Sequence, residues 1–193
     1  MPPSPAPVPA AARWAVGQGY AGPARVAVLG GSYGGYVALV AAGSAPDVFA
    51  AAVGIGGIVR PAHHLRSRVA CSRGRLAHNW HRFVGDPNDP AQEAGMPARS
   101  PAGRLDRPHV PLLVVQGADV RVAKGESDRL VEVLRLRGTE VEYLVKEGVG
   151  HSFVNPESQL DVHHTVRRFL ARHLGGEPSA SSVRRADAGC YRP

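Results

Sequence analysis

The chain is poor in cysteine, in lysine and in long apolar runs, and each shortage argues against a class of protein or site. Only Cys71 and Cys190 occur in 193 residues, so we expect neither a structural disulfide nor a cysteine-ligated metal. No run of about 18 apolar residues is present, which argues against a membrane-spanning helix. The first twelve residues lack the basic start and unbroken apolar centre of a secretory signal. We therefore expect a cytoplasmic protein with no membrane partner and no metal or other cofactor.

Positive charge comes almost entirely from arginine, which supplies 21 of the 23 basic residues and leaves a net charge of +7. A nucleic-acid platform interleaves its basic groups with aromatic side chains on which bases stack. Here aromatic residues make up only 6% of the chain, and the arginines are spread along it. The densest groups are Arg66, Arg68, Arg73 and Arg75, and Arg167, Arg168 and Arg172. We therefore expect no nucleic-acid partner.

Composition divides the chain into a central domain and two tails. Residues 1–12 are rich in proline and alanine, and residues 177–193 are polar. Neither stretch has enough apolar surface to offset the entropy cost of ordering it. We predict that both tails are disordered and that residues 13–176 form one domain.

Within the domain, short apolar runs alternate with longer amphipathic segments. We predict strands at 26–30, 50–57, 112–117 and 141–146, and helices at about 34–44, 123–137 and 157–174. Strands that are apolar throughout and connected through helices indicate a parallel sheet with both faces covered. The predicted fold class is therefore α/β, with a parallel sheet of about four strands flanked by helices.

The stretch V-A-V-L-G-G-S-Y-G-G-Y-V-A-L-V, residues 26–40, places one serine among four glycines. The glycines let the backbone turn sharply on both sides of Ser32. The pattern G-x-S-x-G between a predicted strand and a predicted helix is the context of a nucleophile elbow. The backbone amide of Tyr33, at the start of that helix, would then donate to an oxyanion. The alternative is a glycine-rich turn that binds phosphate or packs a helix closely.

A serine hydroxyl needs a base to become a nucleophile, and the base needs a group that orients it. Asp119 follows the third predicted strand and His151 follows the fourth. Both lie past the carboxyl ends of their strands, at the edge where parallel sheets build their sites. The chain order serine, aspartate, histidine is that of α/β-hydrolases. We therefore predict that Ser32, Asp119 and His151 meet as a catalytic triad.

Four stretches together resemble the C-terminal catalytic domain of the prolyl oligopeptidase family of serine peptidases, family S9. They are A-A-A-R-W-A-V-G-Q-G-Y, R-V-A-V-L-G-G-S-Y-G-G-Y, S-P-A-G-R-L-D-R-P-H-V-P-L-L-V-V-Q-G-A-D-V-R-V and E-Y-L-V-K-E-G-V-G-H-S-F-V-N-P-E, and the similarity runs from about residue 10 to 174. The resemblance implies an α/β-hydrolase fold with Ser32 as nucleophile, His151 as general base and Asp119 as its orienting acid. It also implies cleavage of peptide or ester bonds through an acyl-enzyme.

The chain departs from the family pattern in two ways that bear on function. Only Ala118 separates Gly117 from Asp119, where the family usually has two residues, and one residue spans up to about 3.5 Å of chain. The resemblance also implies a domain order in which a β-propeller precedes a full eight-stranded hydrolase. The propeller and the first four strands are therefore expected to be missing here. Strand 26–30 would then have an unpaired edge, through which we expect self-association.

Two other interpretations of the function stay open. In the first, the chain is an inactive fragment of a longer S9 peptidase that survives as a structural or interaction remnant. In the second, it is a small esterase of the dienelactone-hydrolase type.

By resemblance, Trp80 and Phe83 lie where the family builds part of its substrate pocket, and simple packing is the alternative. Adjacent histidines diverge in a helix or strand, so the pairs at 63–64 and 163–164 are not expected to share a metal.

Overall fold

The computed structural model describes residues 7–67, 80–82, 84–104, 110–117, 124–151 and 153–176. Its strands form a four-stranded sheet in the order β1-β2-β3-β4, and every pairing is parallel. The strands are β1 (Ala27–Gly31), β2 (Ala51–Ile55), β3 (Leu112–Gly117) and β4 (Val141–Lys146). This confirms the α/β class and the parallel sheet that the sequence predicts.

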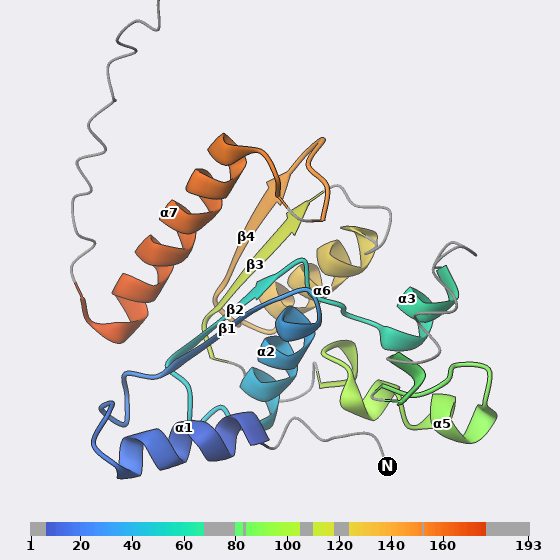
Figure 1. Cartoon of the computed structure of the whole chain (residues 1–193), viewed down its shortest axis with the longest axis horizontal. Coiled ribbons are helices and arrows are strands. Elements are labelled where there is room, and N and C mark those ends of the chain that lie inside the picture. Colours follow the sequence, from blue (N-terminus) through green and yellow to red (C-terminus); the bar gives the residue numbers. More distant parts are fainter. Residues whose placement is uncertain are drawn as a thin grey trace, which may run out of the picture.

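Helices cover both faces of the sheet (Figure 1). One face carries α1 (Pro7–Gly17), α2 (Tyr33–Ser44) and α6 (Lys124–Leu136), and the other carries α7 (Pro156–Leu174). The connection from β2 to β3 holds α3 (Pro61–Ser67), α5 (Pro90–Ala94) and the 3₁₀ turns η3 (Pro97–Arg99) and η4 (Ala102–Arg104). Figure 1 shows α3 and α5 to the right of α2. Within the described ranges, no helix combines the length and apolar character that crossing a membrane requires.

Neighbouring residues of each strand enter separate apolar cores on the two faces of the sheet. The core beneath α2 and α6 contains Ala52, Leu112 and Val114. The core beneath α7 contains Ala51, Val53, Leu113, Val115 and the fully buried Phe169. Because side chains alternate along a strand and both faces are buried, the central positions of β2 and β3 are apolar on both faces.

Helix α2 is the element that holds the serine turn in place. Eight of its twelve residues are buried, and most of these are alanine, glycine or valine. Small side chains allow the helix axis to approach the sheet closely, and a helix that is apolar on most sides belongs in the core. The start of α2 is therefore anchored by packing along much of the helix.

Helix α1 corrects one prediction. Residues 7–12, which the composition assigned to a disordered tail, form the first part of this helix. The helix is stable there because alanine is the best helix former and because Pro7 and Pro9 lie in the first turn, where proline is tolerated. Val8 and Ala12 also pack against the core under α2. Residues 1–6 and 177–193 lie outside the described residues.

Side-chain hydrogen bonds hold both ends of α7. At its start, the Asn155 Oδ1 accepts from the backbone N–H of Glu157 at 2.9 Å, as an N-cap does. At its end, Arg25 donates to the carbonyl oxygens of Leu174 at 2.9 Å and Gly175 at 2.8 Å. The Asn155 bond fixes where the loop between β4 and α7 ends, and the Arg25 bonds tie the end of α7 to the segment before β1.

Candidate active site

Ser32 occupies the turn between β1 and α2 with a backbone conformation that serine rarely adopts. Its φ is 56° and its ψ is −117°. Its N–H donates to the carbonyl oxygen of Ile55 at 2.8 Å, and its own carbonyl accepts from the N–H of Tyr36 at 3.1 Å. A positive φ in a residue with a Cβ is strained and persists only where the surroundings impose it. Here β2 and α2 impose it, and the half-buried Ser32 lies at the carboxyl edge of the sheet.

Close approach of the backbone explains two of the four glycines of the turn directly. A Cβ on Gly35 would lie 2.9 Å from the Cα of Gly57. A Cβ on Gly30 would lie 2.2 Å from the carbonyl oxygen of Gly34, which is far inside van der Waals contact. A Cβ on Gly34 itself would meet no other part of the molecule within 4 Å. The turn therefore depends on the absence of a side chain at residues 30 and 35.

His151 reaches Ser32 from the opposite end of the chain. Its Nε2 lies 2.9 Å from the Ser32 Oγ, although 119 residues separate them in sequence. The Nδ1 of the same ring is buried. In the tautomer that carries its proton on Nδ1, Nε2 accepts a hydrogen bond from the serine hydroxyl. The structure thus brings together two of the three residues predicted to form a triad.

The third predicted member, Asp119, lies outside the described residues, and so does Phe83. The structure does describe Gly117, the last residue of β3. A Cβ on this glycine would lie 2.7 Å from the carbonyl oxygen of Val149 and 3.0 Å from that of Gly150. The strand end that precedes Asp119 therefore lies against the backbone that leads into His151. The role of Asp119 stays a prediction.

An aromatic cluster lies beside the serine. The Tyr33 ring meets the Trp80 ring edge to face, with centroids 5.3 Å apart and planes at 84°. It also lies 5.7 Å from the Tyr36 ring, and Trp80 in turn contacts the buried His64 at 5.5 Å. Tyr33 keeps 38% of its surface exposed, and burial raises the pKa of its phenol, so the ring is neutral at neutral pH.

Sequence reasoning found only part of this cluster. It placed Trp80 in a substrate pocket and used only the backbone amide of Tyr33, which as the first residue of α2 has no intrahelical acceptor for its N–H. It missed the Tyr33 side chain, Tyr36 and His64. The one available signal was an aromatic residue directly after the nucleophile, since such a side chain must lie at the same edge of the sheet.

The parallel sheet flanked by helices agrees with the comparison with known proteins. The sequence model of the prolyl oligopeptidase family, peptidase family S9, matches residues 8–177. The chain belongs to the prolyl oligopeptidase family.

Two curated relatives and one solved structure show how much of an S9 protein this chain represents. It is 36% identical over 167 residues to dipeptidyl aminopeptidase BIII of Pseudoxanthomonas mexicana, covering 86% of this chain and 24% of that protein. It is 36% identical over 171 residues to dipeptidyl peptidase family member 6 of Caenorhabditis elegans, covering 86% and 23%. A puromycin-hydrolyzing peptidase of Mycobacterium tuberculosis superposes with a TM-score of 0.77 at 30% identity, over 86% of this chain and 25% of that one. The chain therefore spans about a quarter of the length of these relatives.

The histidine pair at 63–64 of this S9 domain diverges, as predicted. His63 is exposed, and its Nδ1 lies 2.6 Å from the Oε1 of Glu126 at the start of α6. The other oxygen of Glu126 accepts the backbone N–H of Arg60 at 3.2 Å. His64 is buried and contacts Trp80 instead. Glu126 thus connects α6 to the start of α3.

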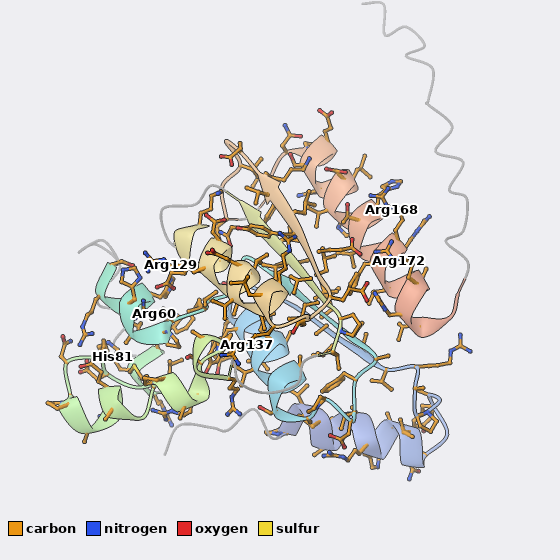
Figure 2. The ribbon with its side chains drawn as sticks, turned by 180° about the vertical axis from the view of Figure 1, so that it is seen from behind. Arg60, His81, Arg129, Arg137, Arg168 and Arg172 are labelled. Atoms are coloured by element: carbon orange, nitrogen blue, oxygen red, sulfur yellow. The ribbon has the colours of Figure 1, made fainter. Side chains whose placement is uncertain are left out.

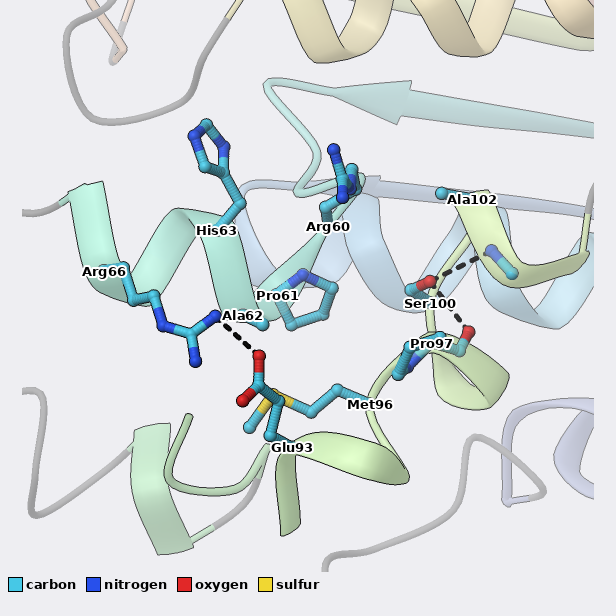
Figure 3. A pocket seen from close by; sticks show the side chains of 11 residues that line it. Arg60, Pro61, Ala62, His63, Arg66, Glu93, Met96, Pro97, Ser100 and Ala102 are labelled. Atoms are coloured by element: carbon cyan, nitrogen blue, oxygen red, sulfur yellow. Dashed lines mark hydrogen bonds and ion pairs between the residues drawn. The ribbon is translucent and has the colours of Figure 1, made fainter. Parts of the chain in front are cut away.

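A cavity of about 380 Å³ lies among α3, α5, η3 and η4 of the S9 domain (Figure 3). Its polar side is formed by Arg60, His63, Arg66 and Glu93, and the Arg66–Glu93 ion pair at 2.6 Å crosses one end. Among the residues that the structure describes, its lining does not include Ser32, Tyr33, Trp80 or His151. The cavity is therefore separate from the serine and histidine.

Arginines of the S9 domain lie on several separate elements (Figure 2). Figure 2 shows Arg129 on α6, Arg168 and Arg172 on α7, and Arg60 near α3. Several are engaged in ion pairs with neighbouring carboxylates, such as Arg172 with Glu142 of β4. The positive charge is thus distributed over the surface and partly neutralised locally.

Proposed function

We propose that this chain hydrolyses peptide or ester bonds through an acyl-enzyme, with Ser32 as the nucleophile and His151 as the general base. The observation that supports the proposal best is the 2.9 Å contact between the Ser32 Oγ and the His151 Nε2. Membership of a serine peptidase family supports it as well. We further propose Asp119 as the acid that orients the imidazole, as its place after β3 suggests.

The chemistry follows from this geometry. The Ser32 hydroxyl gives its proton to Nε2 of His151 while its oxygen bonds to the scissile carbonyl carbon, and the carbonyl oxygen takes the electron pair. The Tyr33 N–H donates to this oxyanion at the N-terminus of α2. When the carbon–nitrogen or carbon–oxygen bond breaks, the imidazolium returns the proton to the leaving group. Water then attacks the acyl-enzyme in the same way and releases the acid.

Covalent labelling tests the proposal directly. A fluorophosphonate probe reacts only with a serine that a base has activated, so we expect one adduct, on Ser32, in the peptide map of the labelled chain. Ser44, an exposed serine at the end of α2, serves as the internal control and should carry none. A folded sample that takes up no probe would overturn the proposal in favour of the inactive-remnant interpretation. Labelling with hydrolysis of esters but not of peptides would favour the esterase.

We propose that Tyr33 and Trp80 form one wall of the substrate site, with Phe83 as a further member. The wall is supported by the exposed part of Tyr33, which directly follows the nucleophile and contacts Trp80. One relative is a dipeptidyl aminopeptidase and another a puromycin-hydrolyzing peptidase. Dipeptide anilides and puromycin are therefore the first substrates to test.

Replacing Trp80 by alanine is expected to raise KM about tenfold and to change kcat less than about threefold. The reason is that the variant removes apolar contact with the substrate but leaves Ser32 and His151 in place. Steady-state kinetics on an active dipeptide anilide measures both constants. Trp14→Ala, which removes the largely exposed tryptophan of α1, is the matched control. Equal KM values for the two variants would contradict the assignment of the wall.

We propose that a further strand or a second copy covers the free edge of β1. Strand β1 is an edge of the described sheet and pairs there only with β2. Its Leu29 side chain is 51% exposed, which is unusual for an apolar residue in a parallel strand. Self-association through this edge stays a prediction.

A further inference from the structure

The position of the His151 ring depends on the elements around it, because His151 lies in the loop between β4 and α7 rather than in a helix or strand. Hydrogen bonds at the start of α7 fix the far end of that loop. Two glycines at the carboxyl ends of neighbouring strands lie beside the part of this loop that contains His151. They are Gly56, directly after β2, and Gly117, at the end of β3.

Gly56 lies against the imidazole itself. A Cβ on Gly56 would be 3.4 Å from both Cε1 and Nδ1 of His151, which is ordinary van der Waals contact, so the ring lies within one methyl group of this residue. The backbone at this residue cannot shift freely, because its N–H donates to the carbonyl oxygen of Val115 at 2.8 Å. Its φ of 56° is in the left-handed region, which favours glycine. At residue 56 the chain therefore places backbone without a side chain on one side of the histidine ring.

Gly117 supports the backbone that leads into His151. A Cβ there would lie 2.7 Å from the carbonyl oxygen of Val149 and 3.0 Å from that of Gly150. Real Cβ atoms do not approach so closely, so any side chain at residue 117 would push the loop away from the sheet. The loop packs directly against Gly117, and the ring that it carries lies beside Gly56.

We propose that Gly56 and Gly117 form a glycine seat that positions the His151 imidazole over the Ser32 hydroxyl. The two glycines are positioning residues, since they act through His151 and touch neither substrate nor reacting atoms. The inference rests on the proposed function, because it assigns them to the proton transfer between Ser32 and His151. A displacement of about 1 Å at such a step lowers a rate by about a hundredfold.

Labelling rates test the part of the seat formed by Gly117, when Gly117→Ala is compared with a destabilised variant whose new methyl group meets no neighbour. Gly138 also has a positive φ, 76°, and a Cβ there would meet nothing within 4 Å. Gly138→Ala should therefore lower the melting temperature by about 2–8 °C through backbone strain alone and leave the labelling rate unchanged. Gly117→Ala should slow fluorophosphonate labelling by about ten- to a hundredfold, because its methyl group would overlap the carbonyl oxygens that precede His151. Equal labelling rates for Gly117→Ala and Gly138→Ala would overturn the proposal.

A spectroscopic measurement on the unmodified chain decides the matter independently of activity. The seat predicts a nuclear Overhauser effect between an α-proton of Gly56 and the Cε1 proton of His151. The chain has nine histidines, and the signal that disappears in His151→Gln identifies the right one. Absence of this effect in the folded chain would overturn the seat, even where a variant fails to fold. If the chain binds no probe but the effect is present, the proposed function fails and the seat stands as a structural feature.

Discussion

Replacing Ser32 or His151 by alanine is expected to lower kcat/KM for a p-nitrophenyl ester by about 10⁴-fold or more, and replacing both is expected to lower it no further. The two side chains perform one step, the transfer of a proton as the serine oxygen attacks. With either one absent that step does not occur, so removing the other costs nothing more. The residual rate then comes from oxyanion donors such as the Tyr33 amide and from substrate binding.

The measurement needs a matched histidine variant and a check of the fold. His163→Ala removes an exposed histidine of α7, and we expect it to keep the full rate. Circular dichroism and melting temperature show whether each variant is folded. Losses that multiply in the double variant would contradict a joint step, because they would mean that Ser32 and His151 contribute separately. A His151→Ala rate equal to that of the unmodified chain would exclude His151 as the base.

The sheet could be predicted closely because its strands are buried on both faces. The third and fourth strands have the predicted bounds, 112–117 and 141–146. The second was predicted to reach residue 57, but it ends at Ile55. The physical reason is the φ of 56° at Gly56, which no strand contains. An apolar run with glycines at its end looks continuous in sequence, and only the backbone angle shows where the chain leaves the sheet.

The segments outside the sheet were harder to predict, because tertiary contacts decide them. The proline- and alanine-rich stretch at 7–12 looked disordered until Val8 and Ala12 were seen against the core. The short helices between β2 and β3 have too few residues for a periodic pattern, and helices of this length depend on packing for their stability. Sequence composition reports neither kind of contact.

In the candidate site, too, some contacts could be predicted from the sequence and others could not. Chain order and position at strand ends were enough to predict that Ser32 and His151 meet, and their atoms lie 2.9 Å apart. The Tyr33–Trp80 contact and the approach of Gly56 to His151 join residues far apart in sequence. No local pattern encodes them. The four glycines around Ser32 look equivalent in sequence, but the structure gives them different surroundings.

Gly30→Ala is expected to lower the free energy of unfolding by about 3 kcal/mol or more and to abolish labelling of Ser32. The new methyl group would lie 2.2 Å from the carbonyl oxygen of Gly34 and 2.3 Å from its carbonyl carbon. These are backbone atoms, so no side-chain rotation relieves the overlap, and β1 and α2 must move apart. That movement breaks the hydrogen bond that the Ser32 N–H donates to the carbonyl oxygen of Ile55.

Gly34→Ala, four residues away in the same motif, should behave in the opposite way. Its methyl group would meet no atom outside the local backbone of α2 within 4 Å. Alanine also favours a helix over glycine by up to about 1 kcal/mol, so the variant should be as stable as the unmodified chain or slightly more stable. Chemical denaturation measures both free energies, and probe uptake reports on Ser32 in each. Equal stability of the two variants would mean that the turn relaxes around a side chain at residue 30. The strained conformation of Ser32 would then have to be imposed by β2 alone, through the bond from its N–H to Ile55.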